Sequence, residues 1–588
     1  MNMMEYKNLI RTPLGKVFAD KVIVNAGLIN VYNGKIMTGL KVAIKGSRIA
    51  YVGTSENMVG ESTEVIDASG LFLAPGYIDP HGHTDFSSNP IALANEILPR
   101  GTTAIMTETK SLTAALRAPG IQAMLDMTEH LPLKFFFSIP AANPIIPHIE
   151  GHESLSMDEF ISFVNHPRAL SVGELVGWVR AVDLDEELLS KLDLVRRIKK
   201  RIEGHAAGCS PETLNALINA GITSCHESIT PEEIELRVSL GIHAMFRHGS
   251  IRNDLETLAQ VITADPECES RWMMMTPDWF SPGDILTKGY MDYLVEEAVR
   301  FGIPPVKAIQ MATINPAQYL GLDRAIGGIG PSRFADILFL ENPALPAPVK
   351  VMVNGDIIAE NGKLIREFAL HCPRFNIGDW RPGRVFPSRA VADHFAVQAS
   401  PAGRGYETVP VIKIVNRTIT KPAYVDLPVE SNRLMINSPE MLKISMVHLD
   451  GDRFVTSFLT GFGASIGGLA TSTAHDHHTP YVIGNNDSDM ALAFNRMMEI
   501  GGGMVLVDGG IIRGQCPLVI GGIMSDQNMA CLNKDLKVIE EYLLSKGSHP
   551  GPLVTLDFLS HTGVPFVRIT PSGLYDVRSK KILFPVKT

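Results

Sequence analysis

Two histidines stand one residue apart at the end of an apolar segment. In FLAPGYIDPHGHTDFSS the apolar run leads directly into His81 and His83. On an extended chain alternate side chains point to the same side, so both imidazoles can hold one metal ion. The spacing therefore indicates a metal site at a strand end, although a pair of ordinary surface histidines has the same pattern.

Two further histidines each lie shortly before the start of a helix. In RIEGHAAGCSPETLN, Ser210 has the character of a helix N-cap, so His205 lies in the loop before that helix. In GITSCHESITPEEIEL, Thr230 is predicted to cap the next helix, which places His226 and Glu227 at the end of the preceding strand. We expect both histidines at the same edge as the first pair, while each taken alone also fits a loop residue bonded to backbone.

Two carboxylates end other apolar runs. Glu174, in ALSVGELVGWVRA, closes a strand between the two groups of histidines, and Asp278 follows the apolar run of RWMMMTPDWFSPGD. Neutral imidazoles alone would leave the positive charge of two divalent ions poorly compensated. We therefore expect an acid among the ligands. An ionised carboxylate beside an activated water can also accept its proton. An aspartate before Ser-Pro-Gly otherwise fits a turn.

The segment that carries these residues alternates short apolar runs with amphipathic stretches of helix length. This alternation over 76–326 predicts strand and helix units around a parallel sheet. Eight such units need about 250 residues, which is the available length, and barrel enzymes keep their active sites at the carboxyl ends of the strands. We therefore predict an α/β fold with a metal-binding (β/α)8 barrel, also called a TIM barrel.

The flanks of this segment differ from it in pattern. Residues 1–75 and 327–385 read as short strands with Asn-Gly turns, which predicts one composite small β-sandwich domain built from both flanks. Residues 386–405 are rich in Pro, Gly and Arg and are predicted as a linker. Strand and helix signals then alternate over 406–588, which we predict as a C-terminal α+β domain.

Composition excludes several classes of protein. Among 588 residues, 53 are Lys or Arg and 63 are Asp or Glu, a balance that offers no cationic footprint for nucleic acid. The sequence shows no signal-peptide pattern and no apolar run of membrane-spanning length, so we expect a cytoplasmic protein without a membrane partner. Six cysteines without a Cys-x-x-Cys pair fit a reducing compartment and exclude the cysteine-ligated zinc nucleobase deaminases.

Taken together, the motifs resemble those of a known superfamily. A strand-end His-x-His, an acid in mid-barrel, two later histidines and a final aspartate resemble the binuclear amidohydrolases. Gly-Glu near 174, Gly-His-x-x-Gly at 204–208, Cys-His-Glu-Ser at 225–228 and the run GFGASIGGLATSTAHDHHTPYVIG further resemble the bacterial adenine deaminases. The resemblance covers nearly the whole chain, and it implies that 406–588 is a C-terminal domain of the adenine-deaminase type.

The resemblance also implies a ligand set for two divalent transition-metal ions, with manganese expected and iron or zinc as alternatives. His81 and His83 would hold one ion, His205 and His226 the second, and Glu174 would bridge them. The implied reaction is the hydrolysis of adenine to hypoxanthine and ammonia, a step of purine salvage. A small purine is then the expected partner, and a homo-oligomer is expected by analogy.

Catalytic and substrate roles follow from the same resemblance. Asp278 would bind metal and move the proton, and Glu227 would protonate or orient a ring nitrogen. The residues expected to contact substrate are Asp85, Arg247, Ser250 and His477.

Three stretches depart from the family pattern. They are TDFSS at 84–88, TETK at 107–110, where the family carries Asp-Pro-His-Glu, and TPDW at 276–279. These changes keep a second hypothesis open, a hydrolase of another aminopurine or of a cyclic amide or N-acyl bond. A barrel kept only for binding is a third, but it predicts broken metal ligands.

Two C-terminal motifs have competing interpretations. The run AHDHHT, with His475, His477 and His478, fits either a surface turn or a place near the active site. Ser465 lies in a Gly-x-Ser-x-Gly match whose glycine-rich surroundings do not fit a nucleophile elbow.

Overall fold

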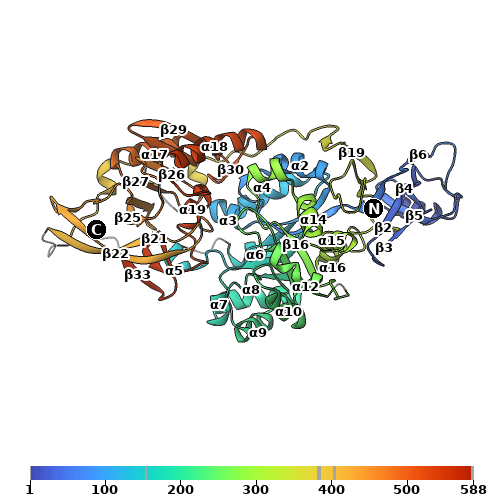
Figure 1. The fold of residues 1–588 in the computed structure, drawn as a ribbon, viewed down its shortest axis with the longest axis horizontal. Helices are drawn as coiled ribbons and strands as arrows, with labels where there is room; N and C mark the ends of the chain where they lie inside the picture. Colours follow the sequence, from blue (N-terminus) through green and yellow to red (C-terminus); the bar gives the residue numbers. More distant parts are fainter. Residues whose placement is uncertain are drawn as a thin grey trace.

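The computed structural model describes residues 2–584 except 152–154, 266, 381–385, 388, 401–404 and 452. Figure 1 shows an elongated molecule, with two small sheets at one end, a barrel with its helices in the middle and a third group of strands and helices at the other end. Within the described residues, no helix combines the length and the apolar character that crossing a membrane requires.

Eight parallel strands, hydrogen-bonded in chain order, form the central barrel. Their side chains are almost all buried, which explains the near-continuous apolar runs of the sequence. A parallel bridge between Gly82 and Asp278 joins the first strand to the segment after the last one, so the barrel is nearly closed. The strands are β8 (Tyr77–Gly82), β10 (Thr102–Glu108), β11 (Lys134–Ile139), β12 (Ala169–Leu175), β13 (Arg201–Gly204), β14 (Ser224–Cys225), β15 (His243–Arg247) and β16 (Met273–Thr276). The predicted barrel is confirmed.

Helices connect these strands and cover the barrel. Ser210 accepts a hydrogen bond from the N–H of Thr213, and Thr230 accepts one from Glu233, so both predicted N-caps are confirmed. Because these caps fix where the helices begin, the histidine segments before them stay at the carboxyl ends of their strands. The longer helices are α2 (Pro90–Ile97), α3 (Lys110–Leu116), α4 (Ala118–Thr128), α6 (Met157–Val164), α8 (Glu186–Arg197), α9 (Pro211–Ala220), α10 (Pro231–Ser239), α13 (Pro282–Lys288), α14 (Met291–Arg300), α15 (Pro305–Met311) and α16 (Ile314–Leu320).

Two sheets from both flanks of the barrel share one apolar core. One has the order β5 (Arg48–Gly53), β4 (Lys41–Lys45), β1 (Lys21–Val24) and β6 (Glu64–Asp67). The other has the order β20 (Lys363–Leu364), β19 (Asp356–Glu360), β18 (Lys350–Val353), β17 (Ile337–Leu340), β7 (Phe72–Pro75), β2 (Gly27–Asn30) and β3 (Lys35–Met37). Antiparallel pairing of β7 with β17 joins the two flanks, and Ile44 and Phe339 pack in the common core. This is the composite sandwich predicted, while its boundaries stay predictions.

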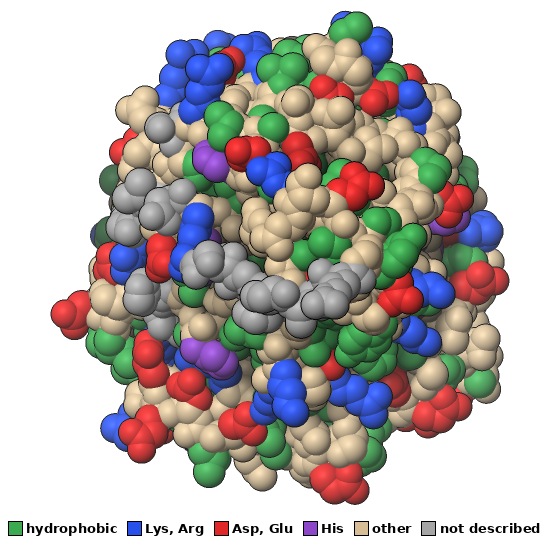
Figure 2. Space-filling view, turned by 90° about the vertical axis from the view of Figure 1, so that its left-hand side faces the viewer, with side chains coloured by type: hydrophobic (Ala, Val, Ile, Leu, Met, Phe, Trp, Pro, Cys, Tyr) green, Lys and Arg blue, Asp and Glu red, His purple; other side chains and the backbone are tan. Residues whose placement is uncertain are grey.

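The C-terminal region is built on a nine-stranded sheet with helices. The strand order is β23 (Arg433–Leu434), β22 (Thr420–Glu430), β21 (Tyr406–Ile414), β25 (Phe454–Thr460), β24 (Leu442–Val447), β27 (Tyr481–Gly484), β26 (Gly468–Thr471), β28 (Gly503–Asp508) and β29 (Ile511–Pro517). A second sheet holds β31 (Val567–Thr570), β32 (Gly573–Asp576) and β33 (Lys581–Phe584), and the helices are α17 (Asp487–Glu499), α18 (Met529–Ser545) and α19 (Pro552–Phe558). On the face shown in Figure 2, acidic and basic side chains are interspersed.

The C-terminal region adds a strand directly to the loop that follows His83. The short strand β9 (Ser87–Ser88) pairs in parallel with β30 (Met524–Ser525). The side-chain amide of Asn89 also donates to the carbonyl oxygen of Ser525 over 3.0 Å. These bonds fix the C-terminal region over the carboxyl end of the barrel.

The segment 386–405, predicted as a linker, includes the short 3-10 helix η3 (Ala392–Phe395). Phe395 of this helix is fully buried, and residues 388 and 401–404 lie outside the described part. The linker boundaries stay predictions.

Candidate active site

The structure brings the six predicted ligands together at the carboxyl end of the barrel. Five are buried and His205 is nearly so. Each comes from the end of a different strand or from the residues just after it, apart from the pair supplied by β8 and its loop. The six, here called the barrel cluster, are His81, His83, Glu174, His205, His226 and Asp278.

Glu174 lies in the middle of the barrel cluster and faces different histidines with its two oxygens. Its Oε1 lies 3.3 Å from His83 Nε2. Its Oε2 lies 2.6 Å from His205 Nδ1 and 3.1 Å from His226 Nε2. One carboxylate is therefore shared between two groups of imidazoles, as a bridging ligand of two ions would be.

Asp278 completes the group on the His81 side. Its Oδ1 lies 3.3 Å from His81 Nε2 and 3.6 Å from His83 Nε2. The His226 ring stacks on the His81 ring with centroids 4.2 Å apart, so the two groups are in contact. The arrangement offers two adjacent sets of nitrogen and oxygen donors.

Unsatisfied polar atoms show that these residues fit a metal ion. The buried Nε2 of His81 has no hydrogen-bond partner among the described residues. His205 Nδ1 and His226 Nε2 face each other over 3.2 Å, although each nitrogen also faces Glu174. Buried groups of this kind cost free energy unless a cation or proton lies between them. Imidazole nitrogens and carboxylate oxygens are the donors that divalent transition ions prefer.

Glu203 was missed by the sequence analysis, and it positions His81. Its Oε2 lies 2.7 Å from His81 Nδ1, an arrangement that fixes the ring and turns Nε2 toward the cluster. Ser171 donates a hydrogen bond to the other oxygen of Glu203. A signal was present, because Glu203 stands two residues before His205 and alternation predicts the same side of the strand.

Two arginines hold the predicted catalytic acids. Arg247 donates to Glu227 and lies 2.7 Å from Asp278 Oδ2, while Arg252 lies 2.6 Å from the other oxygen of Glu227. Burial works against ionisation, but His205 and the arginines lower the pKa of Glu227 to about 2. Burial is likewise outweighed at Asp278, where Arg247 and His81 hold the pKa well below its usual range. Both acids are carboxylates at neutral pH.

The other predicted substrate contacts make hydrogen bonds to protein groups, and Ser250 also lines the pocket described below. Asp85 is fully buried and accepts a hydrogen bond from the N–H of Ser111, next to the start of α3. Ser250 donates to Asp284, and His477 Nδ1 accepts from the N–H of Thr479. Their contact with substrate stays a prediction.

A lysine and the C-terminal region reach the barrel cluster from outside. Lys110 Nζ lies 3.1 Å from Glu174 Oε1 and 2.6 Å from Asp476 Oδ1. The other oxygen of Asp476 lies 2.6 Å from His561 Nδ1. The AHDHHT run is therefore buried beside the active site and is not a surface turn. Lys110 carried a sequence signal, since a cation directly after a buried strand is unusual.

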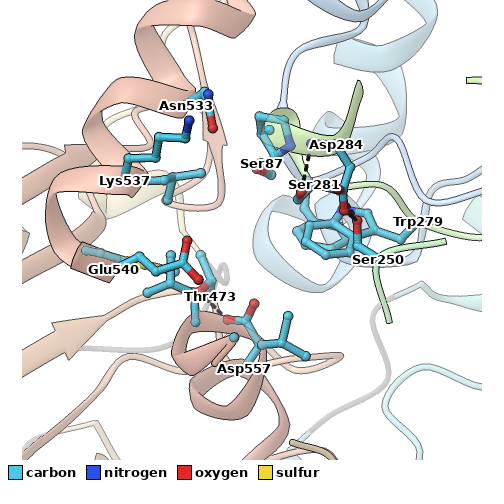
Figure 3. A pocket seen from close by; sticks show the side chains of 18 of the residues that line it. Ser87, Ser250, Trp279, Ser281, Asp284, Thr473, Asn533, Lys537, Glu540 and Asp557 are labelled. Atoms are coloured by element: carbon cyan, nitrogen blue, oxygen red, sulfur yellow. Dashed lines mark hydrogen bonds between the residues drawn. The ribbon is translucent and has the colours of Figure 1, made fainter. Parts of the chain in front are cut away.

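A pocket of about 410 Å³ lies between the barrel and the C-terminal helices (Figure 3). Trp279 lines it from the barrel side, and Asp557 lines it from the C-terminal side. Phe86 stacks on Trp279 with ring centroids 5.6 Å apart. Trp279 directly follows Asp278 of the barrel cluster in the chain, although the residues that line the pocket do not include the cluster itself. Its volume is in the range of small-molecule sites.

Comparison with known proteins identifies the family. Residues 72–359 match the amidohydrolase family, and residues 417–581 match the adenine deaminase C-terminal domain. An adenine deaminase from Moorella thermoacetica is 33% identical to this chain, covering 98% of it and 97% of that protein. The chain belongs to the adenine deaminase family. Another adenine deaminase, from Cenarchaeum symbiosum, is 32% identical and covers 98% of this chain and 94% of its own length.

Family membership confirms the resemblance found in the sequence motifs. The two matched regions place the adenine deaminase C-terminal domain where the nine-stranded sheet lies. Among solved structures, a β-aspartyl dipeptidase from Fervidobacterium islandicum AW-1 aligns with a TM-score of 0.46 and 16% identity, covering 60% of this chain and 99% of that one. As a member of the adenine deaminase family, the chain is a hydrolase that acts on C–N bonds. Its amidohydrolase region belongs to a family of metal-binding enzymes.

Proposed function

We propose that this chain hydrolyses adenine to hypoxanthine and ammonia at the barrel cluster. The observation that carries the proposal is Glu174, whose two oxygens face two separate groups of histidines. The two named relatives are adenine deaminases, and each aligns with this chain over nearly its whole length. All six predicted metal ligands are present in the barrel cluster. Members of the same superfamily that act on cyclic amides supply the competing hypothesis.

The donor set fits two divalent transition-metal ions. His81, His83 and Asp278 would hold one, His205 and His226 the other, and Glu174 would be shared. Manganese is the expected metal, and iron or zinc suits the same donors. Bound there, two such ions would lower the pKa of a water molecule so that it attacks at neutral pH.

Side chains of the protein would then transfer the protons and orient the base. Water adds to C6 of the base, and its proton passes to the carboxylate of Asp278, which is ionised beside Arg247. Asp278 returns the proton to the exocyclic nitrogen as the C6–N bond breaks and ammonia leaves, and transfer of the remaining water proton from the oxygen on C6 to N1 gives hypoxanthine. Glu227, also ionised, accepts a hydrogen bond from a ring N–H and orients the base, a role that fits its low pKa better than proton donation.

The deciding experiment measures ammonia release from adenine by purified protein reconstituted with Mn²⁺, beside a panel of other aminopurines and cyclic amides. His81→Ala should abolish turnover, because the ring is a proposed ligand. His243→Ala is the matched control, since His243 packs against Trp272 in the same barrel but outside the cluster. It should retain turnover.

Two results would contradict the proposal. One is unchanged adenine turnover in His81→Ala. The other is a preference for a panel substrate over adenine with two metals bound per chain, which would favour the competing hypothesis. A homo-oligomer and a cytoplasmic location stay predictions of the sequence.

A further inference from the structure

Lys110 occupies an unusual position, enclosed between the barrel and the C-terminal region. It opens α3 directly after β10 and is 1% exposed. Its ammonium lies 3.1 Å from Glu174 Oε1 and 2.6 Å from Asp476 Oδ1. The backbone around it is also held, because Asn143 donates to the carbonyl oxygen of Lys110 over 2.9 Å. The side chain therefore leaves a fixed base and ends between two carboxylates.

Asp476 has a close ionisable neighbour at each of its two oxygens. It is 1% exposed and stands in the segment between β26 and β27. While one oxygen contacts Lys110, the other lies 2.6 Å from Nδ1 of His561, which follows α19. A continuous chain of polar contacts thus runs from Glu174 through Lys110 and Asp476 to His561.

The three charged groups of this chain of contacts favour one another's charged forms. Burial disfavours the ammonium, but Asp476 and Glu174 outweigh it and raise the pKa of Lys110 above its usual value. Burial opposes ionisation of both acids, and Lys110 overcomes it, so that the pKa of each lies well below the usual range. Lys110 is therefore enclosed between two acids that come from different regions of the chain.

We propose that Lys110 and Asp476 form a strut through which the C-terminal region positions Glu174, the carboxylate shared by both groups of metal ligands. Lys110 and Asp476 are positioning residues in this scheme. The barrel then depends on the C-terminal region to hold its metal ions tightly. The inference rests on the metal centre of the proposed function and extends it to a role for the second region.

A geometric role and a merely electrostatic role predict opposite results. If Lys110 acted only as a charge, its removal would strengthen the binding of divalent cations, because a like charge disappears. If it holds Glu174 Oε1 in place, removal frees the carboxylate to rotate away from His83, and binding weakens. Loss of groups that orient metal ligands typically weakens metal binding about 10- to 100-fold.

The test is a variant that removes the strut without changing the net charge, Lys110→Met with Asp476→Leu. Binding of Mn²⁺ to the full-length chain is measured by chelator competition, with free Mn²⁺ followed by electron paramagnetic resonance and no substrate present. We expect one of the two sites to bind about 10- to 100-fold more weakly. That site should be the one formed by His81 and His83, because Lys110 contacts the oxygen that faces His83.

A second buried lysine with an acidic partner provides the control. Lys191 in α8 is also 1% exposed, and its Nζ lies 3.0 Å from Glu187. Lys191→Met with Glu187→Leu removes a lysine–carboxylate contact elsewhere in the barrel, one whose acid is half exposed. It should lower the melting temperature of the metal-free protein while metal affinity stays within about twofold. A purely structural effect would make the two double variants behave alike.

The outcomes separate this inference from the proposed function. If the unaltered chain fails to bind two Mn²⁺ ions, the proposed metal centre is wrong. If it binds two, and the strut variant binds both within twofold of that affinity, the strut is wrong while the metal centre stands. Should the double variant not fold, Asp476→Glu keeps the charge and lengthens the arm by one methylene. Weaker binding of at least threefold then supports the strut, and unchanged binding overturns it.

Discussion

Among the described residues, the barrel cluster can be compared with a second group of histidines and an acid, here called the C-terminal cluster, and the two differ in how many donor atoms they bring together. The C-terminal cluster consists of His475, Asp476 and His561, and its ligand atoms approach as closely as those of the barrel cluster. In the barrel cluster, carboxylate oxygens face imidazole nitrogens and His81 Nε2 has no hydrogen-bond partner among the described residues. In the C-terminal cluster, the single acid Asp476 lies 2.6 Å from the ammonium of Lys110 and 2.6 Å from Nδ1 of His561.

The difference teaches that residue types and proximity do not by themselves define a metal centre. His475 stacks on Phe558 with ring centroids 5.3 Å apart, and burial lowers its pKa to about 3. It is therefore a neutral ring packed against an aromatic neighbour. Lys110 faces the single acid there, whereas the barrel cluster gathers four imidazoles and two carboxylates into two adjacent sets of donors.

The largest expected effect comes from the proton acceptor of the barrel cluster. Asp278→Asn keeps the shape of the side chain but cannot take up a proton. We expect kcat for ammonia release from adenine to fall about 10²- to 10⁴-fold, the usual contribution of a general base. Metal content, measured on the same sample, shows whether the loss is chemical. Turnover within threefold of the unaltered chain would exclude Asp278 as the proton carrier.

Loss of the carboxylate that orients His81 should have a smaller effect than loss of the proton acceptor. In Glu203→Gln the charge that faces His81 Nδ1 is lost, and we expect metal affinity or turnover to fall about 10- to 100-fold. Glu108 offers a matched control, because burial and Glu203 raise its pKa to about 8 and keep it protonated. Glu108→Gln resembles the protonated acid and should change little. Equal losses in the two variants would contradict the distinction.

The sequence predicted the barrel cluster because each ligand is tied to a local signal. His205 and His226 stand before helices whose caps are readable from a few residues, and strand ends of a parallel barrel meet at one edge. The strut could not be predicted, because Lys110 and Asp476 are far apart in sequence and their contact depends on how two regions pack. Packing between regions has no short-range periodicity in the sequence.

Loop contacts were also beyond the reach of local patterns. The substrate contact of Asp85 stays a prediction, and the sequence did not show that its carboxylate accepts a hydrogen bond from the backbone of Ser111. In the sequence, an acid that follows a His-x-His motif looks the same whether it contacts substrate or accepts a backbone hydrogen bond. The pairing of β9 with β30 was equally hidden, since strands of two residues give no alternation to read.

A pH effect should arise at Asp557, in the pocket between the two regions. Burial raises its pKa to about 7, against a hydrogen bond from Thr473 that lowers it. The folded chain therefore keeps a proton that the unfolded chain releases above about pH 4. The resulting stability is complete below about pH 4 and is lost as pH rises through about 7, at up to about 1.4 kcal/mol per unit.

Asp557→Asn should remove this dependence. Urea unfolding between about pH 5 and pH 8 should show the variant gaining stability relative to the unaltered chain as pH rises. The amide oxygen of Asn can still accept the hydrogen bond from Thr473, so this bond is present in both proteins. A stability difference that does not vary with pH would contradict the assignment of a protonated acid.

The smallest expected effect tests the comparison of the two clusters directly. His475→Gln removes one potential ligand from the C-terminal cluster along with the stack on Phe558. We expect the free energy of unfolding to fall by about 0.5–1.5 kcal/mol, the contribution of an aromatic pair. Two Mn²⁺ ions per chain and adenine turnover within about twofold should remain, because the ring is neutral and the acid beside it is already paired with Lys110. Loss of a bound metal ion from this variant would show that the C-terminal cluster holds a cation of its own, and the distinction between the two clusters would have to be given up.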